Sequence, residues 1–169
     1  MQENIIATIY LIEGPVGAGK STFAAQLSVS HDIAHLNLDE WMATLFSPDR
    51  PAENLVQWYT ERKNRCIEQI WKVACEMLDA GQSVILELGL VQLADREDFY
   101  RRVDGTDYHL QVYFVDTPLA VRRQRVRERN EQKGDTYRME VTDEIFDLAN
   151  SFWQEPTDRE LRERNVEIV

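Results

Sequence analysis

An apolar run that stops at a glycine-rich turn constrains the fold of this chain more than any other feature. The segment IYLIEGPVGAGKSTFAAQL (residues 9–27) begins like a buried strand, places three glycines within six residues and then takes on helical spacing. Gly14, Gly19, Lys20 and Ser21 form the pattern G-x-x-x-x-G-K-[ST] between the two predicted elements. A turn that only joined strand to helix would require neither the lysine nor the serine. The pattern therefore predicts a loop that binds phosphate groups.

The residues of this loop suit the phosphates of a nucleotide. Glycines allow the backbone to wrap closely around phosphate oxygens and to turn its N–H groups inward, and the dipole of the following helix favours an anion. Lys20 is expected to reach the β- and γ-phosphates, and the Ser21 hydroxyl is expected to ligate Mg²⁺. The ligand is expected to be ATP, with GTP left open. The expected nucleotide-binding residues of the loop are Gly14, Pro15, Val16, Gly17, Ala18, Gly19, Lys20, Ser21 and Thr22.

The composition is that of an acidic globular domain. The chain has 169 residues, 43% of them hydrophobic, and a net charge of −11. This charge argues against binding of bulk nucleic acid, which needs a basic surface. The apolar run near the N-terminus is too short to span a bilayer, and no basic segment precedes it. We expect a single cytoplasmic domain over residues 1–169, with Cys66 and Cys75 as free thiols, and the sequence leaves the oligomeric state open.

Strand and helix patterns alternate along the chain, which predicts an α/β sandwich on a parallel sheet. The expected strands are 4–12, 34–38, 83–89, 108–115 and 165–169. The expected helices are 21–29, a short one over 40–46, 52–80, 93–103, one that is capped at 116–118 and runs to about 130, and 142–154. A polar loop over 130–137 separates the last two helices.

Signatures of several other phosphate-loop classes are missing from the sequence. It has neither the N-K-x-D motif of small GTPases nor the L-S-G-G-Q motif of transporter ATPases, and ring ATPases and helicases usually need a longer chain. A compact kinase remains, with a nucleotide in the loop and a small-molecule or nucleotide-like hydroxyl acceptor above it. Two alternatives stay open: a polynucleotide 5′-hydroxyl kinase, and a non-catalytic nucleotide-dependent switch or toxin-like regulator.

Two carboxylates lie at the carboxyl ends of predicted strands, at the edge where this fold class binds its ligands. Asp39 is predicted to act as the catalytic base that accepts the proton of an acceptor hydroxyl. The competing interpretation makes Asp39 the N-cap of the short helix over 40–46. Glu87 is assigned to the metal site, where it would order a water on Mg²⁺ or on the acceptor, and the competing interpretation is a solvated or capping carboxylate.

Arginines are concentrated in one predicted helix. The chain has 15 Arg and only 4 Lys, and the segment VRRQRVRERN contains Arg122, Arg123, Arg125, Arg127 and Arg129. Because Arg122, Arg125 and Arg129 share one helical face, they predict a lid over 122–138 that closes on the nucleotide. Arg125 and Arg129 are the predicted catalytic arginines, since a guanidinium matches phosphate oxygens in pairs. Arg123 and Arg127 are expected to be solvated.

Several further residues are weaker candidates for the acceptor site. Aromatic side chains could stack on a ring of the acceptor, although such residues more often lie in the core. Arginines could bind an anionic acceptor, although surface arginines are common. The aromatic candidates are Trp41, Trp58 and Tyr59, and the arginine candidates are Arg50, Arg62 and Arg96. The three histidines have no metal-ligand spacing and predict no zinc site.

The motifs GPVGAGKST, VILELG, RVRERN and FWQEPTDRE, together with Asp39, give the sequence a family resemblance. It resembles the small AAA-type ATP-binding proteins and P-loop kinases that are related to zeta toxins, chloramphenicol phosphotransferases and polynucleotide 5′-hydroxyl kinases. The resemblance covers nearly the whole chain. It implies a three-layer sandwich on a parallel five-stranded sheet in the order 2-3-1-4-5, with the P-loop strand at the centre.

The resemblance also implies roles for individual residues. Asp39 matches the family's catalytic aspartate, Lys20 and Ser21 match its P-loop pair, and Arg125 and Arg129 match its lid arginines. Arg138 corresponds to a further lid arginine, and Pro156 and Thr157 correspond to a loop that flanks the adenine. Many relatives have Asp at the end of the third strand, where this chain has Glu87. The identity of the acceptor is not implied.

Overall fold

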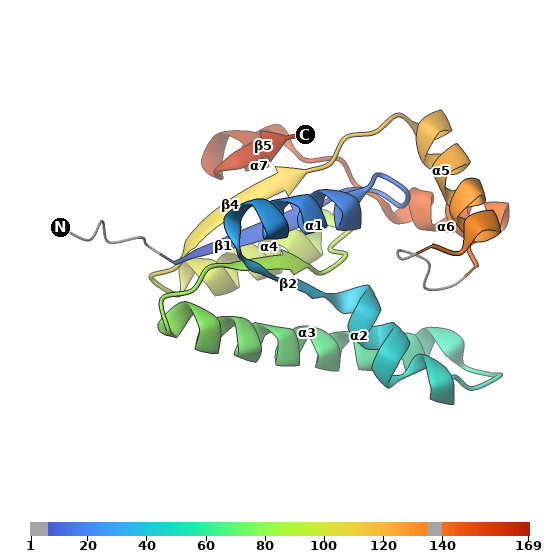
Figure 1. The fold of residues 1–169 in the computed structure, drawn as a ribbon, viewed down its shortest axis with the longest axis horizontal. Coiled ribbons are helices and arrows are strands. Elements are labelled where there is room, and N and C mark those ends of the chain that lie inside the picture. Colours follow the sequence, from blue (N-terminus) through green and yellow to red (C-terminus); the bar gives the residue numbers. More distant parts are fainter. Residues whose placement is uncertain (1–6, 135–139) are drawn as a thin grey trace.

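The computed structural model describes residues 7–134 and 140–169, and the five strands of these residues form one sheet. The strands are β1 (Thr8–Glu13), β2 (Ala34–Asn37), β3 (Val84–Glu87), β4 (His109–Phe114) and β5 (Val166–Ile168). All four pairings are parallel, and the order is β2-β3-β1-β4-β5. The predicted α/β class and strand order are therefore confirmed. In Figure 1 the strands point toward the end of the molecule where α2, α5 and α6 lie.

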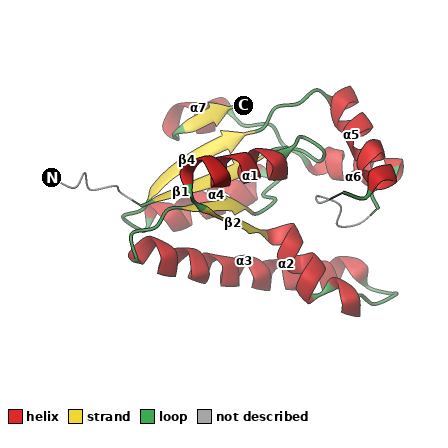
Figure 2. Cartoon of the chain, viewed as in Figure 1, coloured by secondary structure: helices red, strands yellow, loops and turns green. Residues whose placement is uncertain are grey.

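Helices connect the strands and cover both faces of the sheet (Figure 2). They are α1 (Lys20–His31), α2 (Leu38–Leu45), α3 (Leu55–Asp79), α4 (Leu93–Asp104), α5 (Leu119–Gln132), α6 (Asp143–Phe152) and α7 (Asp158–Glu163), with a 3₁₀ turn, η1 (Ser47–Asp49). The sequence did not predict α7 or η1. Among the helices of residues 7–134 and 140–169, none combines the length and apolarity that crossing a membrane requires.

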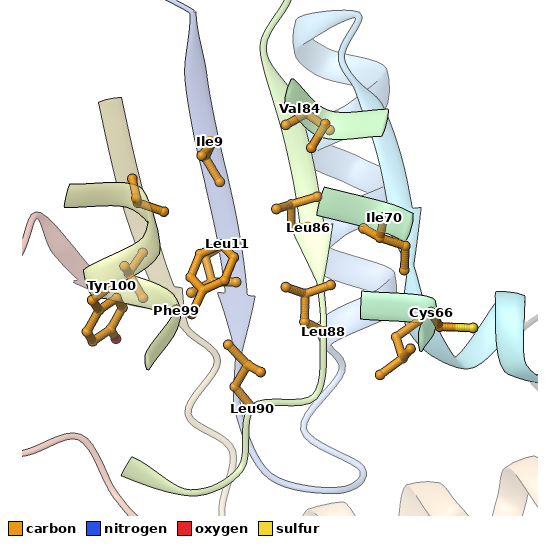
Figure 3. Close-up of a cluster of buried hydrophobic side chains, with 14 of the residues drawn as sticks. Ile9, Leu11, Cys66, Ile70, Val84, Leu86, Leu88, Leu90, Phe99 and Tyr100 are labelled. Atoms are coloured by element: carbon orange, nitrogen blue, oxygen red, sulfur yellow. The ribbon is translucent and has the colours of Figure 1, made fainter. Parts of the chain in front are cut away.

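The core explains why β1 reads as an almost continuous apolar run. Its side chains alternate between the two faces of the sheet, and both faces are covered by helices. Ile9 and Leu11 face α3 and α4, and Figure 3 shows Leu11 of β1 and Leu86 of β3 between Phe99 of α4 and Ile70 of α3. Ile12 faces the opposite side, where α1 packs.

One predicted site residue belongs to this core instead. Arg96 is fully buried, and its Nε and Nη2 donate to the Glu160 carboxylate at 2.7 Å and 3.1 Å. Its guanidinium also lies over the rings of Phe114 and Trp153, 5.5 Å and 5.4 Å from their centroids. The prediction that Arg96 binds an anionic acceptor is wrong, because the guanidinium is used to join α4 to α7.

Candidate nucleotide-binding and phosphoryl-transfer site

At two positions of the loop between β1 and α1, both the backbone conformation and the available space exclude a side chain. Gly14 and Gly17 have φ values of 152° and 75°, in the range that L side chains rarely occupy. A Cβ at Gly17 would lie 2.7 Å from the Arg122 carbonyl oxygen, and one at Gly14 would lie 2.8 Å from that of Val115. The loop is therefore pressed against Val115, the residue after β4, and against α5.

Lys20 begins α1 directly after this loop. Its ammonium donates to the carbonyl oxygens of Gly14 at 2.9 Å and Pro15 at 3.0 Å. The ammonium therefore lies against the loop, at the amino end of α1, where an anion is favoured by the helix dipole. This arrangement fits the triphosphate of a nucleotide.

Ser21 and Glu87 are brought together, as their assignment to one metal site requires. The Ser21 hydroxyl donates to Glu87 Oε1 at 2.9 Å, and Asn37 Nδ2 donates to Glu87 Oε2 at 2.9 Å. Nε2 of His35 lies 3.1 Å from the same Oε2. A hydroxyl beside a carboxylate suits Mg²⁺, which usually takes one or two protein oxygens and completes its shell with substrate phosphates and water. The donor set therefore fits this ion.

Asp39 lies in the first turn of α2 and does not cap that helix. The Asn37 side chain is the cap, because its Oδ1 accepts from the backbone N–H groups of Asp39 at 2.8 Å and Glu40 at 3.2 Å. The capping interpretation of Asp39 is therefore wrong, and its carboxylate is solvent-exposed. Surrounding protein still removes part of its hydration and raises its pKa, while the charges of Lys20 and Arg129 act in the opposite sense.

Arg125 joins α5, the helix predicted to be part of a lid, to the phosphate loop. Its Nη1 donates to the Ala18 carbonyl oxygen at 3.1 Å. The Thr117 hydroxyl donates to the same oxygen at 2.9 Å, so it does not cap α5 as the sequence suggested, and Pro118 occupies the N-cap position. The amino half of α5 is thereby fixed to the loop.

The other arginines of α5 follow the predicted division of the helical faces only in part. Arg129 lies close enough to Asp39 for its charge to oppose the rise that burial gives the pKa of that carboxyl group. Arg127 is exposed and pairs with Asp143. Arg123 was expected to be solvated but is half-buried, because it pairs with Asp147 and lies over the Phe146 ring of α6. Arg138 lies outside the described residues.

Arg122 contributes in a way that the sequence did not indicate. It is buried, and it donates to the Val16 and Thr117 carbonyl oxygens at 3.1 Å and 2.9 Å and to Asn150 Oδ1 at 3.0 Å. Burial lowers the pKa of its guanidinium. This one side chain therefore ties the phosphate loop to α5 and α6. The sequence feature that could have indicated this role is the position of Arg122 on the same helical face as Arg125.

Glu13, the last residue of β1, is a second residue that the sequence analysis missed. It is fully buried, and neither carboxylate oxygen meets a donor with hydrogen-bond geometry among the described residues. Burial raises its pKa to about 8, and Glu87 adds to the shift, whereas Lys20, Arg96 and the Leu90 backbone act against it. The signal was a single carboxylate at the end of an apolar strand, immediately before the first glycine.

The residues assigned to the adenine and the acceptor are more dispersed. Thr157 forms a capping box with Glu160 at the start of α7, so its hydroxyl is used in that cap. The base-flanking roles of Pro156 and Thr157 stay predictions. Arg62 lies over the Trp58 ring, 4.7 Å from its centroid, and donates to the Trp58 carbonyl oxygen. Trp41 packs against the core, and Arg50 is exposed. Tyr59 remains accessible near Asp39.

Comparison with protein families matches residues 9–156 to an AAA domain, AAA_33. The chain belongs to this family. The matched segment begins in β1 and ends at Pro156. It therefore includes the phosphate loop, Asp39 and Glu87, as well as Arg125 and Arg129. Comparison with functionally curated proteins finds no match.

Solved structures share the fold of the AAA_33 chain. A chain of the Pnkp1/Rnl/Hen1 RNA repair complex matches with a TM-score of 0.66 at 18% identity, over 87% of this chain and 44% of that one. A gluconokinase from Sinorhizobium meliloti matches with a TM-score of 0.62 at 14% identity, over 99% of this chain and 83% of that one. Chaetomium thermophilum Kti12 in complex with ADP-AlF3 matches with a TM-score of 0.67 at 11% identity, over 95% of this chain and 88% of that one. The AAA_33 chain spans less than half of the first of these. These neighbours give it a P-loop kinase-like fold.

Proposed function

We propose that this protein binds Mg²⁺-ATP at residues 14–22 and transfers the γ-phosphoryl group to a hydroxyl of a small-molecule or nucleotide-like acceptor. The position of Asp39 is the observation that carries the proposal. Because Asn37 caps α2, the Asp39 carboxylate is not used as a cap and stays exposed. It lies close enough to Lys20 and Arg129 for their charges to affect it. The structures of a gluconokinase and of an RNA repair complex with the same fold support this class of reaction.

Each residue has one role in the transfer. The acceptor oxygen bonds to the γ-phosphorus, the bond from that phosphorus to the β,γ-bridging oxygen breaks, and ADP leaves with that oxygen. Asp39 takes the proton of the acceptor hydroxyl. Lys20, Arg125 and Arg129 offset the negative charge of the transferring group. Mg²⁺, held through Ser21 with Glu87 behind it, would supply charge neutralisation at the phosphate oxygens.

Replacing the catalytic carboxylate tests this function directly. We expect Asp39→Asn to lower Mg²⁺-ATP turnover by about 100-fold or more, because an amide cannot accept the proton, while nucleotide affinity persists. Turnover is measured as ADP formation with a panel of hydroxyl-bearing metabolites, nucleosides and aminoglycosides, and affinity by calorimetry. Glu40→Gln is the matched control, since Glu40 is an exposed carboxylate in the same helical turn and should be dispensable.

The same assays separate the alternatives. Full turnover of Asp39→Asn would remove Asp39 from the mechanism, and absence of nucleotide binding by the unaltered protein would overturn the whole assignment. Transfer of labelled phosphate to 5′-hydroxyl oligonucleotides at low salt would identify a polynucleotide kinase. A protein partner that is captured only with ATP, equally by Asp39→Asn, would identify a nucleotide-dependent switch.

A further inference from the structure

One face of α3 carries both the packing against α2 and a pair of polar side chains. At 100° per residue, Tyr59, Lys63, Cys66 and Ile70 lie within a narrow arc of the helix. Cys66 and Ile70 are buried in the same core cluster as Leu38 and Met42 of α2. Tyr59 and Lys63 therefore lie on the same face of α3 as the residues packed against α2, but nearer to the amino end of α3 than the buried residues.

This face lies beside α2, whose first turn carries Asp39. Leu38, the residue before Asp39, belongs to the packed part, so the first turn of α2 lies against this face of α3. In agreement, the positive charge of Lys63 partly opposes the rise that burial gives the pKa of Asp39. Burial raises the pKa of Tyr59, and the negative charge of Asp39 adds to that rise. Figure 1 shows α2 beside the amino-terminal half of α3. The three side chains share one region.

In the part of the chain that the structure describes, none of these three side chains has a hydrogen-bond or ion-pair partner. Within residues 7–134 and 140–169, the Asp39 carboxylate, the Tyr59 hydroxyl and the Lys63 ammonium make no hydrogen bond, and no ion pair within 4.0 Å. Arg62, one residue before Lys63, is already engaged by the Trp58 carbonyl oxygen and two aromatic rings. Convergent polar groups without partners are typical of a ligand site.

We propose that Tyr59 and Lys63 form the acceptor subsite and that the acceptor is an alcohol with a phosphate or carboxylate group close to its reacting hydroxyl. This inference rests on the proposed kinase function, in which Asp39 receives the proton. The Lys63 ammonium binds the anionic group, and the Tyr59 hydroxyl donates to it. Lys63 also offsets the repulsion that an anion would meet beside Asp39 and Glu87 in a chain of net charge −11.

A binding experiment tests the subsite without knowledge of the natural acceptor. The protein is saturated with Mg²⁺ and the non-hydrolysable analogue AMP-PNP and then titrated calorimetrically with glycerol 3-phosphate, glycerate and glycerol. These probes share a hydroxyl-bearing skeleton and carry a phosphate, a carboxylate and no charge. We expect at least one charged probe to bind about tenfold or more tightly than glycerol, as a charge-assisted hydrogen bond predicts. The arm that binds better distinguishes phosphate from carboxylate.

Variants of two lysines on the same helix assign the effect. We expect Lys63→Met to bring the charged probes to the affinity of glycerol, and Lys63→Arg to retain most of the preference. Lys72 is the matched control, because it lies nine residues later on the opposite face of α3 and is exposed, so Lys72→Met should leave the preference intact. Unchanged melting temperatures of the variants show that they fold.

The outcomes distinguish this inference from the function on which it rests. Failure of AMP-PNP to bind would overturn the proposed function. If AMP-PNP binds but the charged probes bind no better than glycerol, or if Lys63→Met keeps the preference, the function stands and the subsite does not. Loss of the preference in Lys72→Met would point to the overall charge of the helix and would also overturn the subsite.

Discussion

Glu13 is the residue whose position most departs from ordinary protein chemistry. Its pKa of about 8 in the folded chain lies well above its ordinary value of 4.5. Folding therefore takes up a proton between these two values, so the contribution of Glu13 to stability is greatest below pH 4.5 and declines as the pH rises toward 8. We expect the nucleotide-free protein to lose stability across this window.

The variant Glu13→Gln isolates this effect, because glutamine has a similar shape and does not titrate. The free energy of unfolding, measured in denaturant at intervals from pH 5 to pH 9, should fall more steeply for the unaltered protein than for Glu13→Gln. Parallel curves for the two proteins would mean that Glu13 titrates normally in the folded chain, and our account of its burial would then be wrong.

At the scale of elements, the phosphate loop is held in place by α5 and α6, two helices from the carboxy-terminal third of the sequence. The Arg122 guanidinium contacts the loop, the β4–α5 connection and α6 through separate N–H groups. Lysine has no planar fork and cannot make all of these bonds. We therefore expect Arg122→Lys to destabilise the protein by about 2 kcal/mol and to weaken nucleotide binding.

The neighbouring arginine Arg127 supplies the comparison. It pairs with Asp143 at the surface of the same helix, where ion pairs contribute little. Arg127→Lys should leave both the denaturation midpoint and the nucleotide affinity nearly unchanged. Equal effects of the two substitutions would show that the buried contacts of Arg122 do not hold the loop.

At the scale of the whole molecule, nucleotide binding should appear as thermal stability. A ligand at about 100 times its dissociation constant stabilises the folded state by about 2.7 kcal/mol, which raises the melting temperature of a chain of this length by about 5–10 °C. We expect this shift with Mg²⁺-ATP and its loss in Lys20→Met. Measuring GTP in the same way gives the base preference, and equal shifts for Lys20→Met and the unaltered protein would contradict the role of the loop.

The sequence predicted the sheet and the phosphate loop because local signals are strong there. Apolar strands, helical spacing and the fixed interval from Gly14 to Ser21 depend on neighbours in the chain. The same local reasoning offered only Asp39 as a cap for the short helix over 40–46 and overlooked Asn37, although both side chains suit that role. Asn37 holds it because the same side chain also reaches Glu87 on the adjacent strand.

Long-range pairing explains the remaining errors. Arg96 reads as a surface residue until Glu160, distant in the sequence, is placed against it. The helix α7 is too short to show a hydrophobic period, and its capping box and the buried pair with Arg96 stabilise it instead. Lys63 reads as an ordinary surface lysine, because its importance depends on how α3 lies against α2.

The bonds of the Lys20 ammonium to Gly14 and Pro15 bear on how a nucleotide would enter. The lysine already has two oxygen ligands from its own loop, so an arriving triphosphate substitutes one set of oxygens for another. Association would then be an exchange of ligands on a loop that keeps its shape, and the enthalpy released at the lysine would be smaller than a newly formed ion pair would give.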